Sequence, residues 1–245
     1  MIVSHRHRFI YLRTRKTAGT SIEMFLRQFC GPDDIVTRDF PIDERIALTL
    51  GLPGPQHYCA GPLRPWTMTR RDLRWMRRHR GWPRRALVHP HSPAATIRRM
   101  VGEDIWAGYT KITSVRDPWE FVVSHYHFRR RRLSARQLRD GDPPGLTLDD
   151  AVERAGWNWA TYTIDGVPVF DRAIRYEHLQ RDLMAVTDAL GLEPRVDLGA
   201  MKSTHRPPAT AAVDVLEASQ ARRVAELAAG EIALFGYRWS GAEPI

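Results

Sequence analysis

Short apolar runs alternate with amphipathic stretches along most of the chain. The run 8–13 predicts a buried strand, and residues 20–29 place apolar side chains at helical spacing directly after it. Thr20 and Glu23 have the spacing of a capping box, which marks the start of this helix. A strand, a short loop and a helix start together aim backbone N–H groups and the positive end of the helix dipole at an anion.

The same order of elements recurs towards the C-terminus. Residues 109–115 suit a strand, and Asp117-Pro118 suits an N-cap followed by proline at the first helical position. The pattern also predicts a strand over 167–176, a helix over 177–190 and a late helix over 212–227. Alternating strands and helices predict an α/β fold in three layers, with a central parallel sheet flanked by helices.

Length and composition add limits to this picture. The 245 residues fit a single domain spanning 1–245, within which the Pro- and Gly-rich residues 31–65 predict an irregular excursion. Cys30 and Cys59 form no CxxC pair, which argues against a disulfide framework or a zinc site. Apolar runs are far shorter than the ~20 residues that span a bilayer, and the N-terminus lacks a signal core. We therefore expect no membrane span and a cytoplasmic location.

The formal net charge of +9 comes mainly from arginine. Such a balance favours anionic partners, although a genome rich in arginine codons would give the same excess. Residues 64–85 carry nine arginines interleaved with Trp66, Trp75 and Trp82. Arginine and tryptophan side chains together suit an anionic sugar or a nucleic acid, and a solvated basic helix is the simpler alternative.

The first loop offers the densest set of anion-binding groups. In it, Lys16 can reach a bound phosphate, Gly19 lets the backbone approach closely, and Thr20 and Ser21 add hydroxyls at the helix start. The order differs from a Walker A loop, in which the lysine follows the last glycine. The full loop reads Arg15, Lys16, Thr17, Ala18, Gly19, Thr20, Ser21.

This loop resembles the 5′-phosphosulfate loop of sulfotransferases that use 3′-phosphoadenosine 5′-phosphosulfate (PAPS), a family with a P-loop-like fold. The stretch 114–126 is similar to that family's 3′-phosphate motif, in which Arg-[Asp/Asn]-Pro is followed by a serine eight residues after the arginine. The resemblance implies that Arg116 and Ser124 bind the 3′-phosphate. Where the family often has a further arginine, this chain has Phe121.

Other stretches extend the resemblance over nearly the whole chain. Residues 175–192 look like the family's Tyr-Glu-x-Leu segment and residues 232–239 like its closing Phe-Gly-Tyr segment, and we expect both to pack in the core, with Glu177 orienting neighbouring loops. The loop 201–208 occupies the place of a polar loop that closes over the cofactor, so Lys202 and Arg206 are candidate cofactor contacts.

A general base for the acceptor hydroxyl is best sought among histidines, because their pKa lies near neutrality. The pair His89 and His91 resembles the His-x-His of the carbohydrate 2-O-sulfotransferase-like branch, which implies His91 as base and His89 as its partner or a substrate contact. Alternatively, either ring caps a helix that begins near Ser92. Glu23 is the second choice as base, and His125 and His127 are expected to lie farther from the acceptor.

Together these features predict a sulfotransferase that moves the sulfuryl group of PAPS to a hydroxyl, with Lys16 stabilising the charge on the departing nucleotide and no metal required. The expected acceptor is a glycan or glycosylated small molecule, approached from the basic insert 31–90. Two rival predictions remain: a P-loop-type small-molecule kinase, and a basic nucleic-acid-binding protein, suggested only by charge and tryptophan content.

Overall fold

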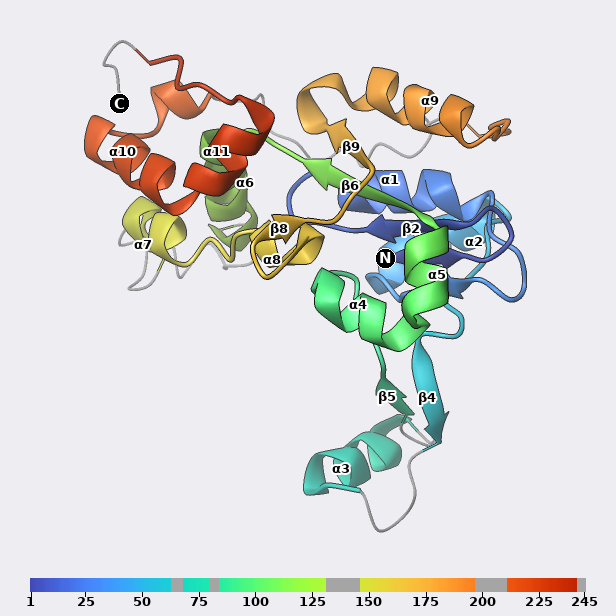
Figure 1. Cartoon of the computed structure of the whole chain (residues 1–245). Coiled ribbons are helices and arrows are strands. Elements are labelled where there is room, and N and C mark those ends of the chain that lie inside the picture. The colour runs from blue at the N-terminus through green and yellow to red at the C-terminus, as the bar shows by residue number, and fades with distance from the viewer. Residues whose placement is uncertain (63–67, 80–83, 131–145, 197–210, 242–245) are drawn as a thin grey trace.

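A five-stranded mixed sheet forms the centre of the computed structural model, which describes residues 1–62, 68–79, 84–130, 146–196 and 211–241 (Figure 1). The strand order is β3-β1-β2-β6-β9, with bounds Ile35–Val36, Ile2–Ser4, Phe9–Leu12, Thr110–Val115 and Arg172–Arg175. Strands β2, β6 and β9 run parallel, whereas β1 is antiparallel to both of its neighbours. The predicted parallel sheet thus holds for the three strands that carry the motifs.

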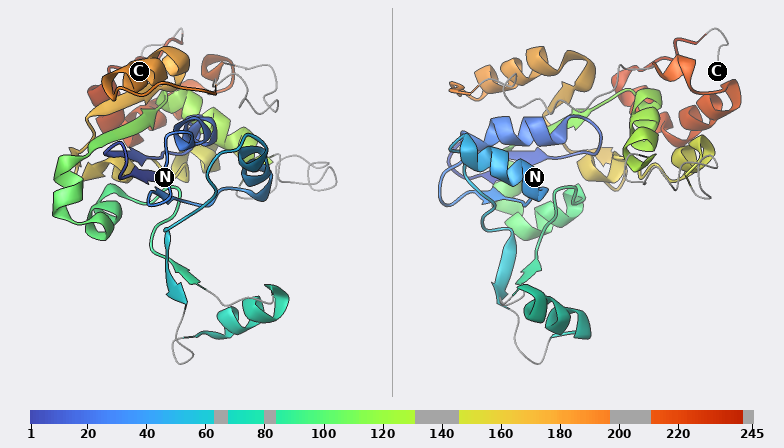
Figure 2. Two further views of the ribbon diagram at one scale, coloured as in Figure 1. Left: turned by 90° about the vertical axis from the view of Figure 1, so that its right-hand side faces the viewer. Right: turned by 180° about the vertical axis from the view of Figure 1, so that it is seen from behind.

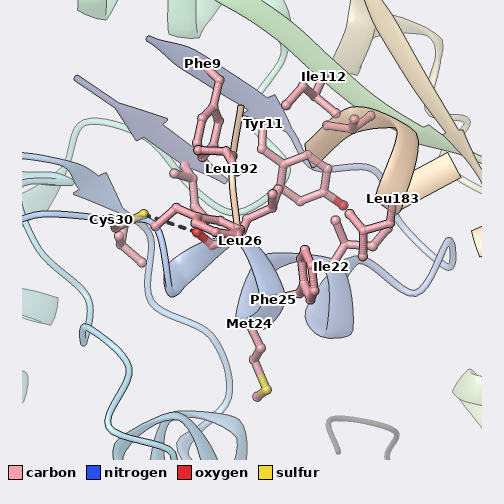
Figure 3. Close-up of a cluster of buried hydrophobic side chains, with 14 of the residues drawn as sticks. Phe9, Tyr11, Ile22, Met24, Phe25, Leu26, Cys30, Ile112, Leu183 and Leu192 are labelled. Atoms are coloured by element: carbon pink, nitrogen blue, oxygen red, sulfur yellow. Dashed lines mark hydrogen bonds between the residues drawn. The ribbon is translucent and has the colours of Figure 1, made fainter. Parts of the chain in front are cut away.

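Each face of the sheet is covered by helices because side chains along a strand alternate between the two faces. Phe9 and Tyr11 join a core beneath α1 (Gly19–Arg27) and α9 (Leu179–Ala189), seen in close-up in Figure 3. Ile10 and Leu12 join a second core with α4 (Ala94–Val101) and α5 (Glu103–Gly108) on the opposite face. All four strand residues are fully buried, and each such side chain contributes about 2 kcal/mol of hydrophobic stabilisation.

A third apolar cluster lies beyond the C-terminal ends of the parallel strands and is built from helices and the segments that connect them. It joins α6 (Pro118–Arg130), α7 (Leu148–Glu153) and α10 (Ala218–Leu227) around buried Trp119 and Val122. The chain closes with α11 (Ala229–Phe235), whose Phe235 packs into the core on the α4 face. The predicted core role of the closing segment is confirmed.

A two-stranded arm projects from this body in both Figure 1 and Figure 2. Strands β4 (Cys59–Pro62) and β5 (Arg84–Ala86) pair antiparallel, and helix α3 (Arg70–His79) lies at their far end. The prediction of an irregular excursion over 31–65 is only partly correct, because this segment also contains the regular elements β3 and helix α2 (Pro41–Thr49). Proline at the first position of α2 suits a helix start.

Element boundaries differ from the sequence pattern in two further places. The predicted strand 167–176 is divided into β8 (Val167–Pro168), which pairs with β7 (Thr163–Ile164), and β9. The predicted helix 212–227 is a single 3-10 turn followed by α10, and a short helix α8 (Trp159–Tyr162) precedes β7. Within the part of the chain that the structure describes, no helix is long and apolar enough to cross a bilayer.

Candidate functional site

The loop between β2 and α1 bends sharply by means of two left-handed residues. Lys16 has φ 59° and Ala18 has φ 60°, a conformation that costs a residue with a side chain on the order of 1 kcal/mol. Ala18 is also the N-cap of α1 and gives no side-chain cap, and the first turn of the helix contains no acidic residue. The start of α1 is thus left electrostatically positive, as an anion site requires.

A buried cluster of hydroxyl groups ties this loop to strand β6. The Ser114 Oγ lies 2.9 Å from Thr14 Oγ1, 2.8 Å from Thr17 Oγ1 and 2.9 Å from the Tyr11 hydroxyl. All four residues are fully or almost fully buried. The side chain of Thr17 therefore serves the loop itself, and its backbone N–H is the group that it can offer to a ligand.

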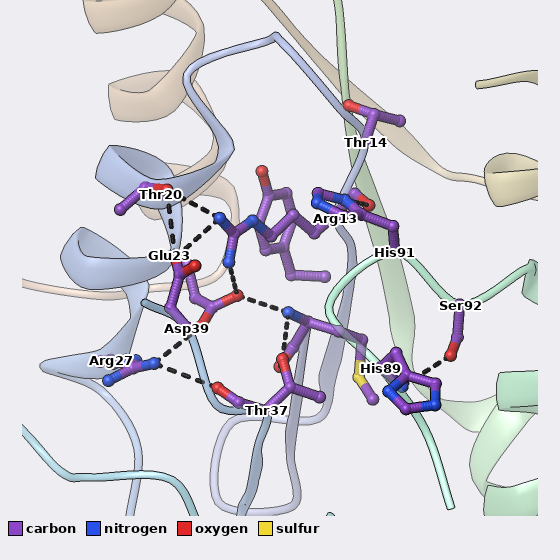
Figure 4. A network of polar contacts seen from close by, with 12 residues as sticks. Arg13, Thr14, Thr20, Glu23, Arg27, Thr37, Asp39, His89, His91 and Ser92 are labelled. Atoms are coloured by element: carbon purple, nitrogen blue, oxygen red, sulfur yellow. Dashed lines mark hydrogen bonds and ion pairs between the residues drawn. The ribbon is translucent and has the colours of Figure 1, made fainter. Parts of the chain in front are cut away.

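Arg13 supports the loop from below (Figure 4). Its guanidinium donates to Thr20 Oγ1 at 2.7 Å and forms ion pairs with Glu23 at 2.9 Å and Asp39 at 2.7 Å. Gly19 packs against this arginine, because a Cβ at Gly19 would stand 3.0 Å from the Arg13 side chain. Position 19 requires a residue without a side chain, because Arg13 fills the space that the side chain would occupy.

The predicted capping box of Thr20 and Glu23 is wrong. The helix begins at Gly19, and Glu23 instead lies in the core, where Arg13, Arg27 and the N-terminal ammonium surround its carboxylate. Burial alone would raise the pKa of Glu23, but these three cations outweigh it and lower that pKa to about 2. A carboxylate so acidic and so enclosed is poorly suited to accept a proton, which argues against Glu23 as base.

Asn158 holds the loop at Arg15 from the other side. Its Oδ1 accepts a hydrogen bond from the Arg15 N–H at 2.8 Å, and its Nδ2 donates to the Arg15 carbonyl at 3.1 Å. The Arg15 side chain remains exposed. Sequence reasoning missed this anchor, because Asn158 and Arg15 lie 143 residues apart and no local pattern links them. The flanking Trp157 and Trp159 pack against Phe121 and Tyr162, respectively.

Arg116 brings the second motif into contact with the first. Its Nη1 donates to the Lys16 carbonyl at 3.3 Å, its Nη2 pairs with Glu120 at 3.1 Å, and its guanidinium lies 4.1 Å from the centre of the Tyr176 ring. Asp117, the predicted N-cap, accepts hydrogen bonds from the Trp119 and Glu120 N–H groups. Arg116 is thus fixed between the loop and the start of α6.

Glu177 also acts at this junction, as expected. Its carboxylate accepts a hydrogen bond from the Asp117 N–H at 2.8 Å and another from the Tyr237 hydroxyl at 3.4 Å. The closing Phe-Gly-Tyr segment is thereby joined to the turn that begins α6. Burial raises the pKa of Asp117 to about 6, and the nearby carboxylates of Glu177 and Glu120 act in the same direction.

One row of α6 faces the loop. Glu120, Ser124 and Phe128 are four residues apart and share a helix face; Glu120 contacts Arg116, and the Lys16 Nζ lies 4.1 Å from the centre of the Phe128 ring. Half-buried Ser124 stands between these two contacts in the row. Phe121 is buried in the helical cluster and brings no cation to this site.

His91 lies at the C-terminal end of β2, next to the loop. Its Nδ1 is 3.1 Å from the Arg13 carbonyl oxygen, and because a carbonyl only accepts, Nδ1 carries the proton. Burial lowers the pKa of His91 to about 4, helped by the positive charge of Arg13. The ring is therefore neutral at pH 7, and its Nε2 holds the lone pair that a base needs.

His89 does not pair with His91. It is exposed, and its backbone N–H donates to Ser92 Oγ at 2.8 Å in a tight turn, so that the two rings point in different directions (Figure 4). Neither ring caps a helix, because α4 begins after Pro93 without a side-chain cap. His125 is a histidine that sequence reasoning placed farther away. Burial lowers the pKa of His125 to about 4, and the positive charges of Arg129, Lys16 and Arg15 act in the same direction.

Ser21 is half-buried in the first turn of α1, whereas Lys202 and Arg206 lie outside the described residues. No group of three or more potential metal ligands occurs among the residues that the structure describes.

Comparisons with protein-family models, with curated proteins and with solved structures gave no match to this chain.

Proposed function

We propose that the chain is a PAPS-dependent sulfotransferase whose cofactor lies across the β2–α1 loop and the start of α6. The observation that carries the proposal is the contact of Arg116 with the backbone of Lys16. Two anion-binding groups from motifs far apart in the sequence lie side by side, as a ligand with two separate phosphate groups requires. In the proposed fold the sheet and its two helical layers correspond to a P-loop-like core.

In this proposal the 5′-phosphosulfate occupies the loop. The N–H groups at the start of α1 bind its oxygens, and Lys16 places its ammonium near the bridging oxygen. The 3′-phosphate lies between Arg116 and Ser124, where the guanidinium is already held over the ring of Tyr176. Arginine suits this position because its planar fork can bind a phosphate through two parallel hydrogen bonds.

Transfer proceeds by attack of an acceptor hydroxyl oxygen on the sulfur. The bond from sulfur to the 5′-phosphate oxygen breaks, and 3′-phosphoadenosine 5′-phosphate (PAP) leaves with the bonding electrons, its charge stabilised by Lys16. The hydroxyl proton goes to Nε2 of His91, while Arg13 holds the opposite nitrogen. A base of low pKa accepts this proton late, as the bond to sulfur forms and the hydroxyl becomes acidic.

The acceptor in this proposal is a sugar hydroxyl, on a glycan or a glycosylated small molecule, and the location is the cytoplasm. The acceptor assignment is supported by the His-x-His resemblance and by the position of His91 near the base of the arm. It is tested by offering the enzyme radiolabelled PAPS with panels of free sugars, glycosides and polysaccharides.

Calorimetric titration tests the cofactor assignment directly. PAP is expected to bind without metal, and more tightly than ATP with Mg²⁺, which a P-loop-type kinase would prefer. Lys16→Ala should weaken PAP binding roughly 10- to 100-fold, the range of one or two charge-assisted hydrogen bonds. The control is Arg222→Ala, an exposed arginine of α10. Preference for ATP, or equal loss in both variants, would refute the proposal.

A further inference from the structure

Almost the whole charge excess of the chain belongs to the arm. Residues 59–86 contain nine arginines and one acidic residue, which gives +8 of the total +9 and leaves +1 for the rest of the chain. The rest of the chain is therefore nearly neutral. A concentrated positive charge on a projecting element has a longer reach than the same charge spread over a surface, because neighbouring acidic groups do not offset it.

Helix α3 carries this charge on an ordered face. Arg70, Arg74 and Arg77 follow the spacing i, i+4, i+7, which puts them along one side of the helix, and all three are exposed. Among the described residues, the side chain of none of the three forms an ion pair or a hydrogen bond. They are available to an anionic partner.

Apolar side chains accompany these arginines. Leu73 is 49% exposed, and Met76, three residues farther on, is half-buried on the adjoining side of the helix. A nucleic-acid backbone or a soluble polyanion would neutralise the arginines and leave Leu73 in water. The interface of a bilayer that contains anionic lipids accepts both, with arginines at the headgroups and leucine among the upper acyl carbons.

The arm is fixed to the body at its base. The Leu87 N–H donates to the Tyr58 carbonyl at 2.8 Å just below the paired strands, and the next residue, Val88, is fully buried. His91 follows within three residues. The arm thus positions the body relative to whatever α3 binds, with the candidate active site close to the point of attachment.

We propose that α3 and the arm dock this protein on the surface of a membrane that carries anionic lipids. Arg70, Arg74 and Arg77 bind the lipid phosphates, and Leu73 and Met76 enter the interface. The arm holds the protein at the membrane surface. This docking is independent of the sulfotransferase proposal, since it involves no residue of the cofactor site.

Co-sedimentation of the full chain with vesicles tests the docking. Vesicles of phosphatidylcholine and phosphatidylglycerol should bind the protein at least ~10-fold more tightly than phosphatidylcholine alone, and about 0.5 M salt should release it. The triple variant R70Q/R74Q/R77Q should lose roughly 100-fold in affinity. The control R45Q/R99Q/R222Q removes three exposed arginines of the body and should bind within about 2-fold of the wild type.

Leu73→Ser separates a membrane from other polyanions. It should weaken vesicle binding about 5-fold and leave binding to duplex DNA or to heparin unchanged. Circular dichroism checks that each variant is folded, and PAP titration checks that the cofactor site is intact. Equal binding to neutral vesicles, tighter binding to DNA or heparin than to anionic vesicles, or an unchanged Leu73→Ser variant would each overturn the proposal.

Discussion

Arg116 donates a hydrogen bond to the carbonyl oxygen of Lys16 at 3.3 Å, across a separation of 100 residues in the sequence. Strand pairing makes this possible, because β2 and β6 are parallel neighbours whose C-terminal ends meet at the same edge of the sheet. The loop after one strand and the helix start after the other therefore lie side by side at that edge. Such edges are where ligands bind in α/β proteins.

Replacing Arg116 by lysine tests how the guanidinium is used. Lysine keeps the charge but loses the contact of the guanidinium with the Tyr176 ring and the two-pronged geometry. We expect Arg116→Lys to weaken PAP binding about 10-fold, with Arg116→Met weaker still. Calorimetric titration measures both, and Arg99→Lys on α4 is the control. Wild-type affinity in Arg116→Lys would show that charge alone is needed.

His91→Asn tests the base while it preserves the local contact. The asparagine amide nitrogen stands where Nδ1 of histidine donates to the Arg13 carbonyl, but Asn lacks Nε2. Turnover with PAPS and an acceptor should fall ~100-fold or more, with PAP affinity unchanged. His89→Asn is the control, because His89 is exposed. Retained turnover in His91→Asn would show that His91 is not the base, and His125 would be the next candidate.

Thr17→Val should destabilise the protein by about 1 to 3 kcal/mol, because valine matches the shape of threonine but leaves the Ser114 hydroxyl without one of its partners. Thr17→Ser keeps the hydroxyl and should cost less. Urea unfolding of the two variants measures the difference. If Thr17→Ser loses more stability than Thr17→Val, packing of the threonine methyl group and not the hydroxyl cluster holds the loop.

Glu23→Gln should cost about 3 to 5 kcal/mol, because it leaves buried Arg13 and Arg27 without their shared carboxylate. The pH dependence has a definite sign. The pKa of Glu23 is lowered from 4.5 to about 2, so its stabilisation is complete above pH 4.5 and is lost as the pH falls towards 2. Urea unfolding between pH 2.5 and pH 7 should therefore show a steeper acid loss in the wild type than in Glu23→Gln.

Asp117 gives the opposite sign. Its folded pKa is raised from 3.8 to about 6, so the folded state binds more protons and loses stability as the pH rises from about 4 to 6. Asp117→Asn keeps an N-cap residue of comparable strength and removes the titration. Between pH 4 and pH 6 the free energy of unfolding of this variant should change less than that of the wild type, by an amount on the order of 1 kcal/mol. An identical pH profile in both proteins would contradict the raised pKa.

The motifs and the elements that carry them could be predicted because they rest on local chemistry. Apolar periodicity located β2 and α1, and Asp117 followed by proline located the start of α6. Contacts between distant segments left no such signal. Glu23 has the spacing of a capping box in sequence, yet its place in the core is set by Arg13, Arg27 and α2. Asn158 holds the loop through geometry that only the folded chain creates, and the short antiparallel strand β1 has no pattern of its own.

The left-handed backbone at Lys16 and Ala18 implies a conflict between stability and activity at Lys16, and no such conflict at Ala18. Glycine relieves strain at either residue. At Ala18 the exchange gives up only a methyl group, whereas at Lys16 it removes the ammonium on which the proposed chemistry depends. Selection for higher stability could therefore replace Ala18 by glycine without loss of function. A relative with glycine at position 16 would have lost the proposed activity.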